Sequence, residues 1–328
     1  MPRPIILGVV GDSAGGKTTI TRGLVRLLGE QRVTHIAADD YHRYDRRQRA
    51  DRAITPLDPD CNYIDIMEQD FAQVRAGNAI LKPVYQHKDG SFGPPVYVRP
   101  REFTVVEGLL GYHTEALRDV YDVRVFLAPP EDLRRRWKVQ RDCTRRGYTT
   151  DQVLEELDRR EHDSVEFIRP QEQWADIVVS FMPGAQGDQG HLDANVILRE
   201  GLSHPDLAPL INGTDGGIRL AETDHERRLE IPGSIDPDYA KRIEEAVWDR
   251  MQFASHLRSE RLGEFTIGTE LARSESLALV QVLILYHLVT ARATVALGGL
   301  DNRADSPGGP DQEHSSEEAA EPATVVAD

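Results

Sequence analysis

The chain has 328 residues, of which 39% are hydrophobic, so it is long enough to bury a full core in one large domain or two modest ones. Its formal net charge of -16 argues against non-specific nucleic-acid binding, since a phosphate backbone attracts basic surfaces. With only Cys61 and Cys143, a disulfide framework and a cysteine-rich metal site are excluded, and we expect a reducing cytoplasm.

The first 182 residues alternate between apolar and helical segments. Helical stretches separate most of the apolar ones, and this alternation predicts an α/β core with a mostly parallel sheet covered by helices on both faces. Residues 45–100 are less regular, and we expect a helix at 64–75 with a hairpin or lid around it. The expected strands are residues 5–10, 33–38, 103–106, 123–127 and 177–181.

The composition changes after residue 182. A polar, glycine-rich stretch up to residue 190 indicates a linker, and a smaller α+β domain is expected over residues 183–300. Its predicted elements are a strand at 195–199, two short strands within 216–231, and amphipathic helices over 239–258 and 270–295. Residues 277–291 are too short and too polar for a membrane span, which indicates a buried helix. Residues 301–328, with eight acidic residues and one basic, predict a disordered tail.

A phosphate-binding loop pattern follows the first expected strand and opens the first expected helix. Backbone N–H groups and the helix N-terminus are suited to a polyphosphate, and this context disfavours the alternative of a glycine-rich turn without a ligand. Lys17 is expected to reach the outer phosphates of ATP, and the Thr18 hydroxyl to ligate Mg²⁺. The predicted nucleotide-binding residues are Gly11, Asp12, Ser13, Ala14, Gly15, Gly16, Lys17, Thr18 and Thr19.

Two acidic residues, Asp39 and Asp40, follow the second expected strand. Either one is suited to accept the proton of an acceptor hydroxyl or to reach Mg²⁺. An arginine-rich segment comes next and indicates an anionic substrate such as a sugar phosphate. The alternative is a solvated loop whose arginines pair with nearby aspartates, but the phosphate loop favours substrate binding. The arginines are Arg43, Arg46, Arg47, Arg49 and Arg52.

Three further groups lie near expected strand ends or on a helix. Glu107 closes the third strand, where a carboxylate can hold Mg²⁺. Lys138, Arg141 and Asp142 share a helix face that can close over ATP as a lid, or that can be a water-exposed, salt-bridged face. Residues 82–87, which include Tyr85 and His87, are a weaker candidate for a polar substrate pocket. His287, by contrast, is expected to be a satisfied core histidine.

Together these motifs resemble the phosphoribulokinase and uridine kinase family, in family order over about residues 5–181. Beyond the phosphate loop, the resemblance rests on Asp39-Asp40-Tyr41-His42, Asp45-Arg46, Leu57-Asp58-Pro59, Lys82-Pro83-Val84-Tyr85, Val106-Glu107-Gly108-Leu109, Trp137-Lys138-Val139-Gln140-Arg141-Asp142, Arg146-Gly147-Tyr148-Thr149 and Pro170-Gln171. It implies ATP-dependent phosphorylation of the C1 hydroxyl of D-ribulose 5-phosphate, a step of carbon fixation in the Calvin cycle.

The resemblance also implies roles for single residues. Asp39 falls on the catalytic base, Glu107 on the Mg²⁺ carboxylate, and Lys17, Lys138, Arg141 and Asp142 on groups that meet the transferring phosphoryl. His42 and Arg46 fall near the sugar-phosphate contacts, and Arg146 and Arg159 on arginines tied to substrate or effector binding. With Arg49, Tyr85 and His87 from the segments above, they are the predicted substrate-binding residues. Ala14 and Gly15 stand where plant-type relatives carry a cysteine, so the thioredoxin switch is expected to be absent.

Two other functions stay open on the sequence. One is a uridine kinase-like nucleoside kinase, which the arginine-rich segment disfavours because a neutral nucleoside has no phosphate to hold. The other is a regulatory protein that binds ATP without turnover, which the joint presence of Asp39, Glu107 and Asp142 disfavours. We expect a cytoplasmic homo-oligomer, with a dimer favoured, that binds a small-molecule substrate and neither nucleic acid nor membrane.

Overall fold

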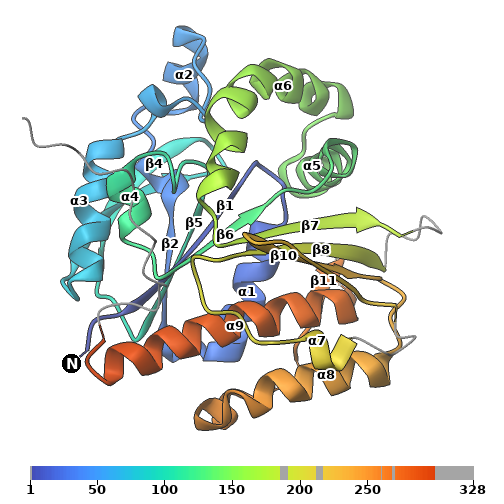
Figure 1. The fold of residues 1–328 in the computed structure, drawn as a ribbon. Coiled ribbons are helices and arrows are strands. Elements are labelled where there is room, and N and C mark those ends of the chain that lie inside the picture. The colour runs from blue at the N-terminus through green and yellow to red at the C-terminus, as the bar shows by residue number, and fades with distance from the viewer. Residues whose placement is uncertain (1, 185–190, 212–216, 260, 268–269, 300–328) are drawn as a thin grey trace, which may run out of the picture.

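The computed structural model describes residues 2–184, 191–211, 217–259, 261–267 and 270–299. Their centre is an eight-stranded sheet with helices on both faces (Figure 1). Its strands, in spatial order, are β2 (Val33–Ala37), β5 (Phe103–Gly108), β1 (Ile5–Gly11), β6 (Val123–Leu127), β7 (Ile177–Pro183), β8 (Leu192–Arg199), β10 (Glu226–Ile231) and β9 (Arg219–Glu222). The strands from β2 to β7 run parallel, which confirms all five strands expected in the first 182 residues, and β8, β10 and β9 continue the sheet antiparallel.

Two hydrophobic cores cover the two faces of the sheet. The apolar run of β1 supplies both, since alternate side chains of a strand point to opposite faces. Ile5, Leu7 and Val9 face the core that holds α1 (Lys17–Leu28), α8 (Pro237–Asp249) and α9 (Glu275–Ala296). Ile6 and Val10 face the core that holds α3 (Ile64–Arg75) and α4 (Glu115–Asp119). The bounds of α3 are those that the sequence predicts.

The remaining elements are two hairpins, a short helical turn and three helices at one end of the sheet. Around its carboxyl end lie α2 (Arg46–Arg52), α5 (Glu131–Arg146) and α6 (Thr150–Asp163), in the upper part of Figure 1. The expected hairpin within residues 45–100 is present as β3 (Ile80–Gln86) and β4 (Ser91–Val98). A second hairpin pairs β11 (Glu264–Ile267) with β12 (Glu270–Arg273), and α7 (Ala208–Ile211) is a single short turn.

Beyond residue 190, the described residues form no sheet of their own apart from the small β11–β12 hairpin. Strands β8 to β10 extend the main sheet from β7, and α8 and α9 bury their side chains in the same core as α1 and β1. The boundary expected near residue 182 therefore falls inside one continuous sheet. The expected linker at residues 185–190 and the expected tail at 301–328 lie outside the described residues.

The two predicted C-terminal helices have different bounds in the structure. The helix expected over 239–258 starts earlier, because the Asp236 carboxylate accepts a hydrogen bond from the Tyr239 N–H at 2.8 Å, and it ends at Asp249. A 3-10 segment, Gln252–Leu257, follows it. The helix expected over 270–295 begins only after β12, at the Ser274 cap, and is α9.

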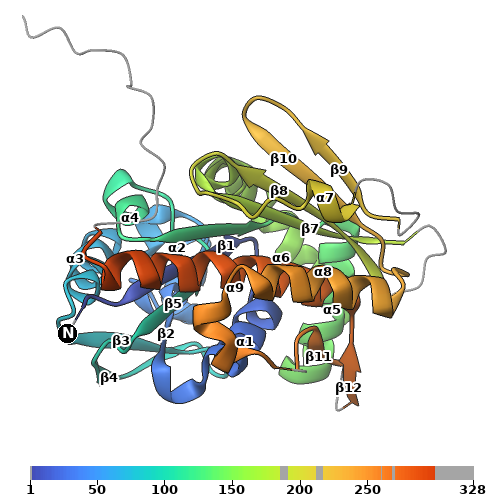
Figure 2. The same cartoon turned by 60° about the horizontal axis from the view of Figure 1, so that its bottom comes forward.

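The prediction that α9 is amphipathic is wrong, because apolar residues surround its axis. It packs against α1 and α8 on one face of the sheet (Figure 2). Most of its length is therefore buried on all sides, and no polar face is needed there. By length and composition it is the one helix among the described residues that could cross a bilayer. Its apolar window is 67% buried inside the fold, as expected of a buried core helix.

A buried histidine pair joins α9 to the segment after β8. His287 Nε2 lies 2.9 Å from His204 Nδ1, and His204 Nε2 lies 2.6 Å from the Arg199 carbonyl oxygen. The Nε2–H of His204 therefore donates to the Arg199 carbonyl oxygen, and His204 Nδ1 accepts a hydrogen bond from the Nε2–H of His287. Burial, together with His204, lowers the pKa of His287 to about 3, although the charge of Asp176 opposes the shift.

This pair predicts acid lability. An unfolded histidine takes up a proton near pH 6.5, whereas His287 in the folded chain does so only near pH 3. Its contribution to the free energy of unfolding is therefore present above pH 6.5 and is lost as the pH falls below that value. Between pH 7 and pH 5 the wild type should lose about 2 kcal/mol more unfolding free energy than His287→Leu. Urea unfolding at several pH values measures this difference, and equal losses in the two proteins would contradict it.

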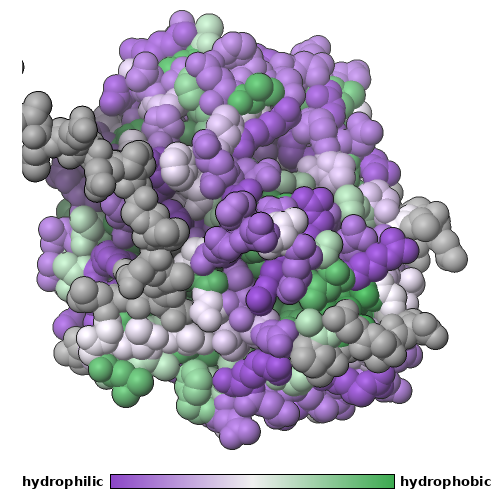
Figure 3. All heavy atoms as spheres, in the orientation of Figure 1, coloured by the Kyte–Doolittle hydropathy of each residue, from purple (hydrophilic) through white to green (hydrophobic). Residues whose placement is uncertain are grey.

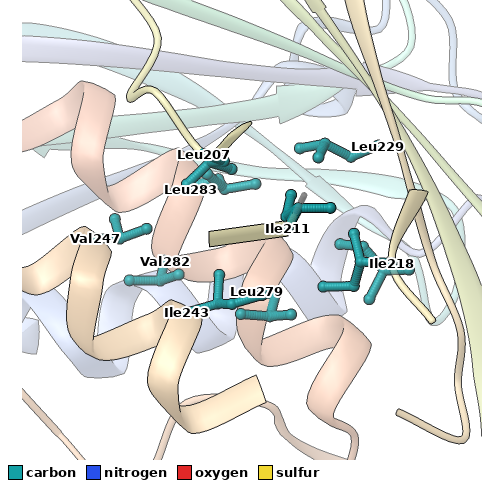
Figure 4. Close-up of a pocket in the computed structure, with 10 residues that line it drawn as sticks. Leu207, Ile211, Ile218, Leu229, Ile243, Val247, Leu279, Val282 and Leu283 are labelled. Carbon is teal, nitrogen blue, oxygen red and sulfur yellow. The ribbon is translucent and has the colours of Figure 1, made fainter. Parts of the chain in front are cut away.

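A cavity lies between α8, α9 and the sheet, and only aliphatic side chains line it (Figure 4). Leu229, Ile243, Val247, Leu279 and Leu283 are among them. Ligand sites combine apolar walls with a few converging polar groups, and this cavity has none and shares no residue with the phosphate loop. We therefore interpret it as imperfect packing of the core.

Candidate active site

The phosphate loop joins β1 to α1, as its motif predicts. Gly16 and Ala14 adopt left-handed backbone, with φ of 95° and 65°. Gly11 packs against β6 so closely that a Cβ would lie 2.6 Å from the Leu127 carbonyl oxygen, so only glycine fits. The Lys17 Nζ donates to the carbonyl oxygens of Gly11 at 2.7 Å and of Asp12 at 2.9 Å. In this form of the protein the ammonium folds back over its own loop.

Three carboxylates surround this lysine. Burial lowers the pKa of Lys17, and the charges of Asp39, Glu107 and Asp12 partly offset that shift. Asp39 follows β2 in the 3-10 turn Ala38–Tyr41, and Glu107 lies near the end of β5. The carboxyl ends of neighbouring parallel strands thus bring together residues that are far apart in sequence, where open α/β sheets bind ligands.

Glu107 faces the first turn of α1. Its Oε2 accepts a hydrogen bond from the Thr21 hydroxyl at 2.9 Å, and its Oε1 lies 3.5 Å from Thr18 Oγ1 and 3.3 Å from His35 Nε2. Burial raises the pKa of Glu107, but hydrogen bonds from His35 and Thr21 and the charge of Lys17 outweigh it, so the pKa is below its usual value. An ionised carboxylate beside a threonine hydroxyl supplies the hard oxygen ligands that Mg²⁺ prefers.

Asp39 and Asp40, equivalent candidates in the sequence, have different partners. Asp40 forms an ion pair with the buried Lys82 and accepts the Tyr85 N–H at 2.8 Å, so it holds the β3 strand in place. Within the described residues no hydrogen bond or ion pair engages Asp39, which lines a small pocket with Asn62. The structure therefore leaves Asp39 as the carboxylate that is available to an incoming hydroxyl.

His42 and Arg49 both contact Tyr85. His42 Nδ1 lies 2.7 Å from Asn62 Oδ1, and burial lowers the pKa of His42 to about 4, against the opposing charge of Asp39. Arg49 projects from α2, is nearly buried, and donates to the Tyr85 hydroxyl at 2.5 Å and the Tyr44 carbonyl oxygen at 2.8 Å. Neither acceptor carries a charge, and no carboxylate pairs with Arg49 among the described residues.

Arg46 and His87 complete the acceptor side. Arg46 donates to the His87 carbonyl oxygen at 2.7 Å, which attaches α2 to the tip of the β3–β4 hairpin. The His87 ring packs edge-on against Tyr85 with 5.1 Å between centroids. Burial lowers the pKa of His87, and Asp39 opposes the shift while Arg146 adds to it. The predicted residues His42, Arg49, Tyr85 and His87 are thus neighbours around one place.

The predicted lid face on α5 divides into two parts. Lys138 is only 1% exposed and lies between α5 and α6, 2.9 Å from Asp142 Oδ2 and 3.6 Å from Glu156 Oε1. Burial raises the pKa of Asp142, but Arg141 and Lys138 outweigh it and bring the pKa to about 2. Of the three residues of this face, Arg141 is the one that reaches the phosphate loop, with its guanidinium 3.3 Å from Ser13 Oγ.

Of the two adjacent arginines on α6, Arg159 is exposed and Arg160 turns inward. Arg160 pairs with Glu156 at 2.5 Å, and burial and the charge of Arg49 lower its pKa while Glu156 raises it. Two like charges, Arg49 and Arg160, therefore interact inside the protein, which is the arrangement that an anion stabilises. Arg146 lies farther out, 3.5 Å from the Asp142 carboxylate.

The sequence does not indicate several residues that hold the site together. Asp12, predicted among the nucleotide-binding residues, has its carboxylate engaged by Arg134 at 3.3 Å and by the Ser164 hydroxyl. Glu156 and Arg160 have a sequence signal, because their spacing of four places them on one helix face. Ser164 and Arg134 have none, since their contacts join segments that are more than a hundred residues apart.

The upper part of the molecular surface, over α2, α5 and α6, is mostly hydrophilic, as a site for phosphorylated ligands requires (Figure 3). A parallel sheet with a phosphate loop after its central strand, a carboxylate near the end of the adjacent strand and an arginine-bearing helix over the loop defines the class of P-loop kinase folds. The chain belongs to the phosphoribulokinase / uridine kinase family, whose profile matches residues 6–186.

Relatives of both branches are similar to this chain. Phosphoribulokinase of Synechocystis sp. is 38% identical over 183 residues, which are 56% of this chain and 55% of the relative. Chloroplastic phosphoribulokinase of Triticum aestivum is 31% identical over 221 residues, 61% of this chain and 55% of the relative. A uridine kinase of Streptococcus equi subsp. zooepidemicus is 29% identical over 188 residues, 55% of this chain and 88% of the relative.

The chain thus spans about half the length of the curated phosphoribulokinases that it matches. Among solved structures, phosphoribulokinase from Rhodobacter spheroides is similar with a TM-score of 0.58 and 19% identity. That similarity covers 78% of this chain and 99% of that one, and at this identity it shows a common fold. The coverage extends well beyond the residues of the family profile, in agreement with the continuous sheet described above.

Proposed function

We propose that the protein catalyses the ATP-dependent phosphorylation of D-ribulose 5-phosphate at C1, giving ribulose 1,5-bisphosphate and ADP. The observation that carries this proposal is the position of Asp39. Asp39 stands in the turn after β2, whose last residue, Ala37, pairs with Glu107. It lines a pocket with Asn62, the partner of His42. These neighbours support a place for its carboxylate between the nucleotide and the acceptor.

In the proposed reaction Asp39 accepts the proton of the C1 hydroxyl as its oxygen attacks the γ-phosphorus of ATP. A new O–P bond forms, the bond from the γ-phosphorus to the bridging oxygen breaks, and ADP leaves with that oxygen. Lys17 and Arg141 offset the negative charge of the phosphoryl oxygens during transfer. Thr18 and Glu107 would hold Mg²⁺, which supplies further charge neutralisation when bound.

The acceptor class follows from Arg49 and Arg160. A sugar phosphate would bring an anion to Arg49, which no carboxylate pairs with among the described residues, and would offset its repulsion with Arg160, whereas a nucleoside such as uridine brings none. The identities to named phosphoribulokinases, 38% and 31%, against 29% for a uridine kinase, favour the same acceptor. We also propose that the chain acts as a cytoplasmic homodimer.

The test is ADP release with Mg-ATP and, separately, ribulose 5-phosphate, ribose 5-phosphate or uridine. Release with ribulose 5-phosphate alone supports the proposal. Release only with uridine would replace the proposed reaction by nucleoside phosphorylation and leave Arg49 and Arg160 without a phosphate ligand. ATP binding without release for any acceptor would favour a regulatory protein that binds ATP without turnover.

A matched pair of variants tests the phosphate site. Arg160→Gln should raise the KM for ribulose 5-phosphate by about 10–100-fold, because a charge-assisted hydrogen bond contributes about 1.5–3 kcal/mol. Arg159→Gln, at the position that the family resemblance implies, should leave it within about twofold, because Arg160 and not Arg159 turns inward. Steady-state kinetics at saturating ATP measure both values. An equal effect of the two substitutions would show that the buried arginine has no special part.

A further inference from the structure

The buried carboxylate of Asp12 stands in the phosphate loop, where a negative charge would repel a polyphosphate. Both of its oxygens are engaged by groups of the protein itself. Oδ1 accepts the Ser13 N–H at 2.6 Å and lies 3.3 Å from the Arg134 guanidinium, and Oδ2 accepts the Ser164 hydroxyl. The carboxylate therefore connects the loop to the segment that starts at Ser164, and it is not a free charge that faces the nucleotide.

Ser164 opens a π-helical turn, Ser164–Ile168, directly after the end of α6. Turns of this kind are rare and occur often at functional sites. Asp163, the last residue of α6, makes a contact in another direction. Its Oδ2 accepts the Thr55 hydroxyl at 2.5 Å, and Thr55 in turn accepts the Leu57 N–H at 3.2 Å. Ser164 is 1% exposed and Thr55 6% exposed, so water does not compete for either hydroxyl.

Thr55 belongs to the segment of residues 53–63, which contacts two groups of the acceptor side, Arg49 and His42. At its start the Ile54 N–H donates to the Arg49 carbonyl oxygen at 3.2 Å. Near its end Asn62 orients His42. Arg160 lies on α6 one turn before Ser164, and its charge and that of Arg49 repel each other. The phosphate loop is thus hydrogen-bonded to Ser164, and the segment of residues 53–63 is hydrogen-bonded to the preceding residue, Asp163.

We infer that the dipeptide Asp163-Ser164 couples the two substrate sites, so that binding of nucleotide at the phosphate loop strengthens binding of the acceptor. The inference rests on the proposed function for the identity of the acceptor. In it Ser164 and Thr55 are positioning residues, since neither is placed to touch the reacting atoms. Coupling between two sites is reciprocal, so the acceptor strengthens nucleotide binding by the same factor.

Calorimetry of the full chain measures this factor. The Kd of a non-transferable ATP analogue with Mg²⁺ is determined with and without saturating ribulose 5-phosphate. The wild type should show a ratio on the order of 5–150, the usual range of coupling between sites. Ser164→Ala and Thr55→Val should each bring the ratio to within about twofold of one, with either ligand alone bound within about threefold of wild type. The double variant should lose no more than either single one, because both act on one connection.

Thr144→Ala is the control, because the Thr144 hydroxyl donates to the Gln140 carbonyl oxygen at 2.6 Å within exposed α5 and joins no two segments. It should keep the wild-type ratio. A merely structural role of Ser164 would lower Tm and leave the ratio unchanged, which would overturn the inference, as would a wild-type ratio of one. If ribulose 5-phosphate does not bind at all, the proposed function fails, and the same ratios measured with inorganic phosphate then decide the inference.

Discussion

Asp39→Asn should lower kcat with ribulose 5-phosphate by about 10²–10⁴-fold, the usual contribution of a positioned general base. Asparagine keeps the size of the side chain and removes its ability to take a proton. Because no other group of the described residues depends on Asp39 for a hydrogen bond or ion pair, the fold should not change. Stopped assays of ADP formation measure kcat, and calorimetry should show that the Kd for Mg-ATP stays within about threefold of wild type.

Asp40→Asn is the matched control, one residue along the same turn. Asp40 neutralises the buried Lys82 and accepts the Tyr85 N–H, so its loss should lower Tm. Turnover should fall by less than about tenfold, because its carboxylate is already engaged and is not available to a substrate hydroxyl. If the Asp40 variant lost turnover and the Asp39 variant kept it, the roles of the two residues would be reversed and the proposed mechanism would be wrong.

The sequence predicts the nucleotide side of this site well because its signals are local. The strand, loop and helix around residues 11–18 are consecutive, and each adopts the conformation that its own residues favour. The position of Glu107 follows in the same way, since the carboxyl ends of parallel strands share one edge of the sheet. The first prediction depends on no distant contact, and the second depends only on β5 joining the parallel sheet beside β1.

The acceptor side depends on such packing, and there the sequence leaves choices open. Asp39 and Asp40 are distinguished only by Lys82 and Tyr85 on a later strand. Arg159 and Arg160 are distinguished only by the rotation of α6 against α5, which Glu156 and Lys138 determine. No pattern within residues 39–40 or 159–160 contains that information.

The C-terminal part shows the same limit at the level of the fold. Helix α9 has apolar residues all round, which on sequence alone suits a helix buried within the subunit or one buried against a second subunit. Its neighbours decide between these. The contact with α1 is so close that a Cβ on Gly23 would lie 2.0 Å from Gln281 Nε2. That proximity joins α9 to the helix of the phosphate loop and explains why residues beyond 190 complete the core around β1.

Lys17→Met should lower kcat by about 10²–10³-fold or more, the loss seen when a group that offsets transition-state charge is removed. It should also weaken nucleotide binding, because the Lys17 ammonium is the cation that the loop itself supplies to the outer phosphates. Methionine keeps the length of the side chain, so the loop should keep its path. Turnover assays and calorimetric titration with the ATP analogue measure the two effects separately.

Removing Lys17 has a second consequence, which distinguishes loss of charge from damage to the loop. Lys17 is one of the groups that lower the pKa of Glu107, so in Lys17→Met that pKa should rise and Mg²⁺ binding should weaken as the pH falls. Lys241→Met, which removes an exposed lysine from α8, should change neither rate nor nucleotide affinity. Unchanged affinity and rate in Lys17→Met would mean that the loop does not bind the phosphates of ATP, and the assignment of both cofactor and reaction would fall with it.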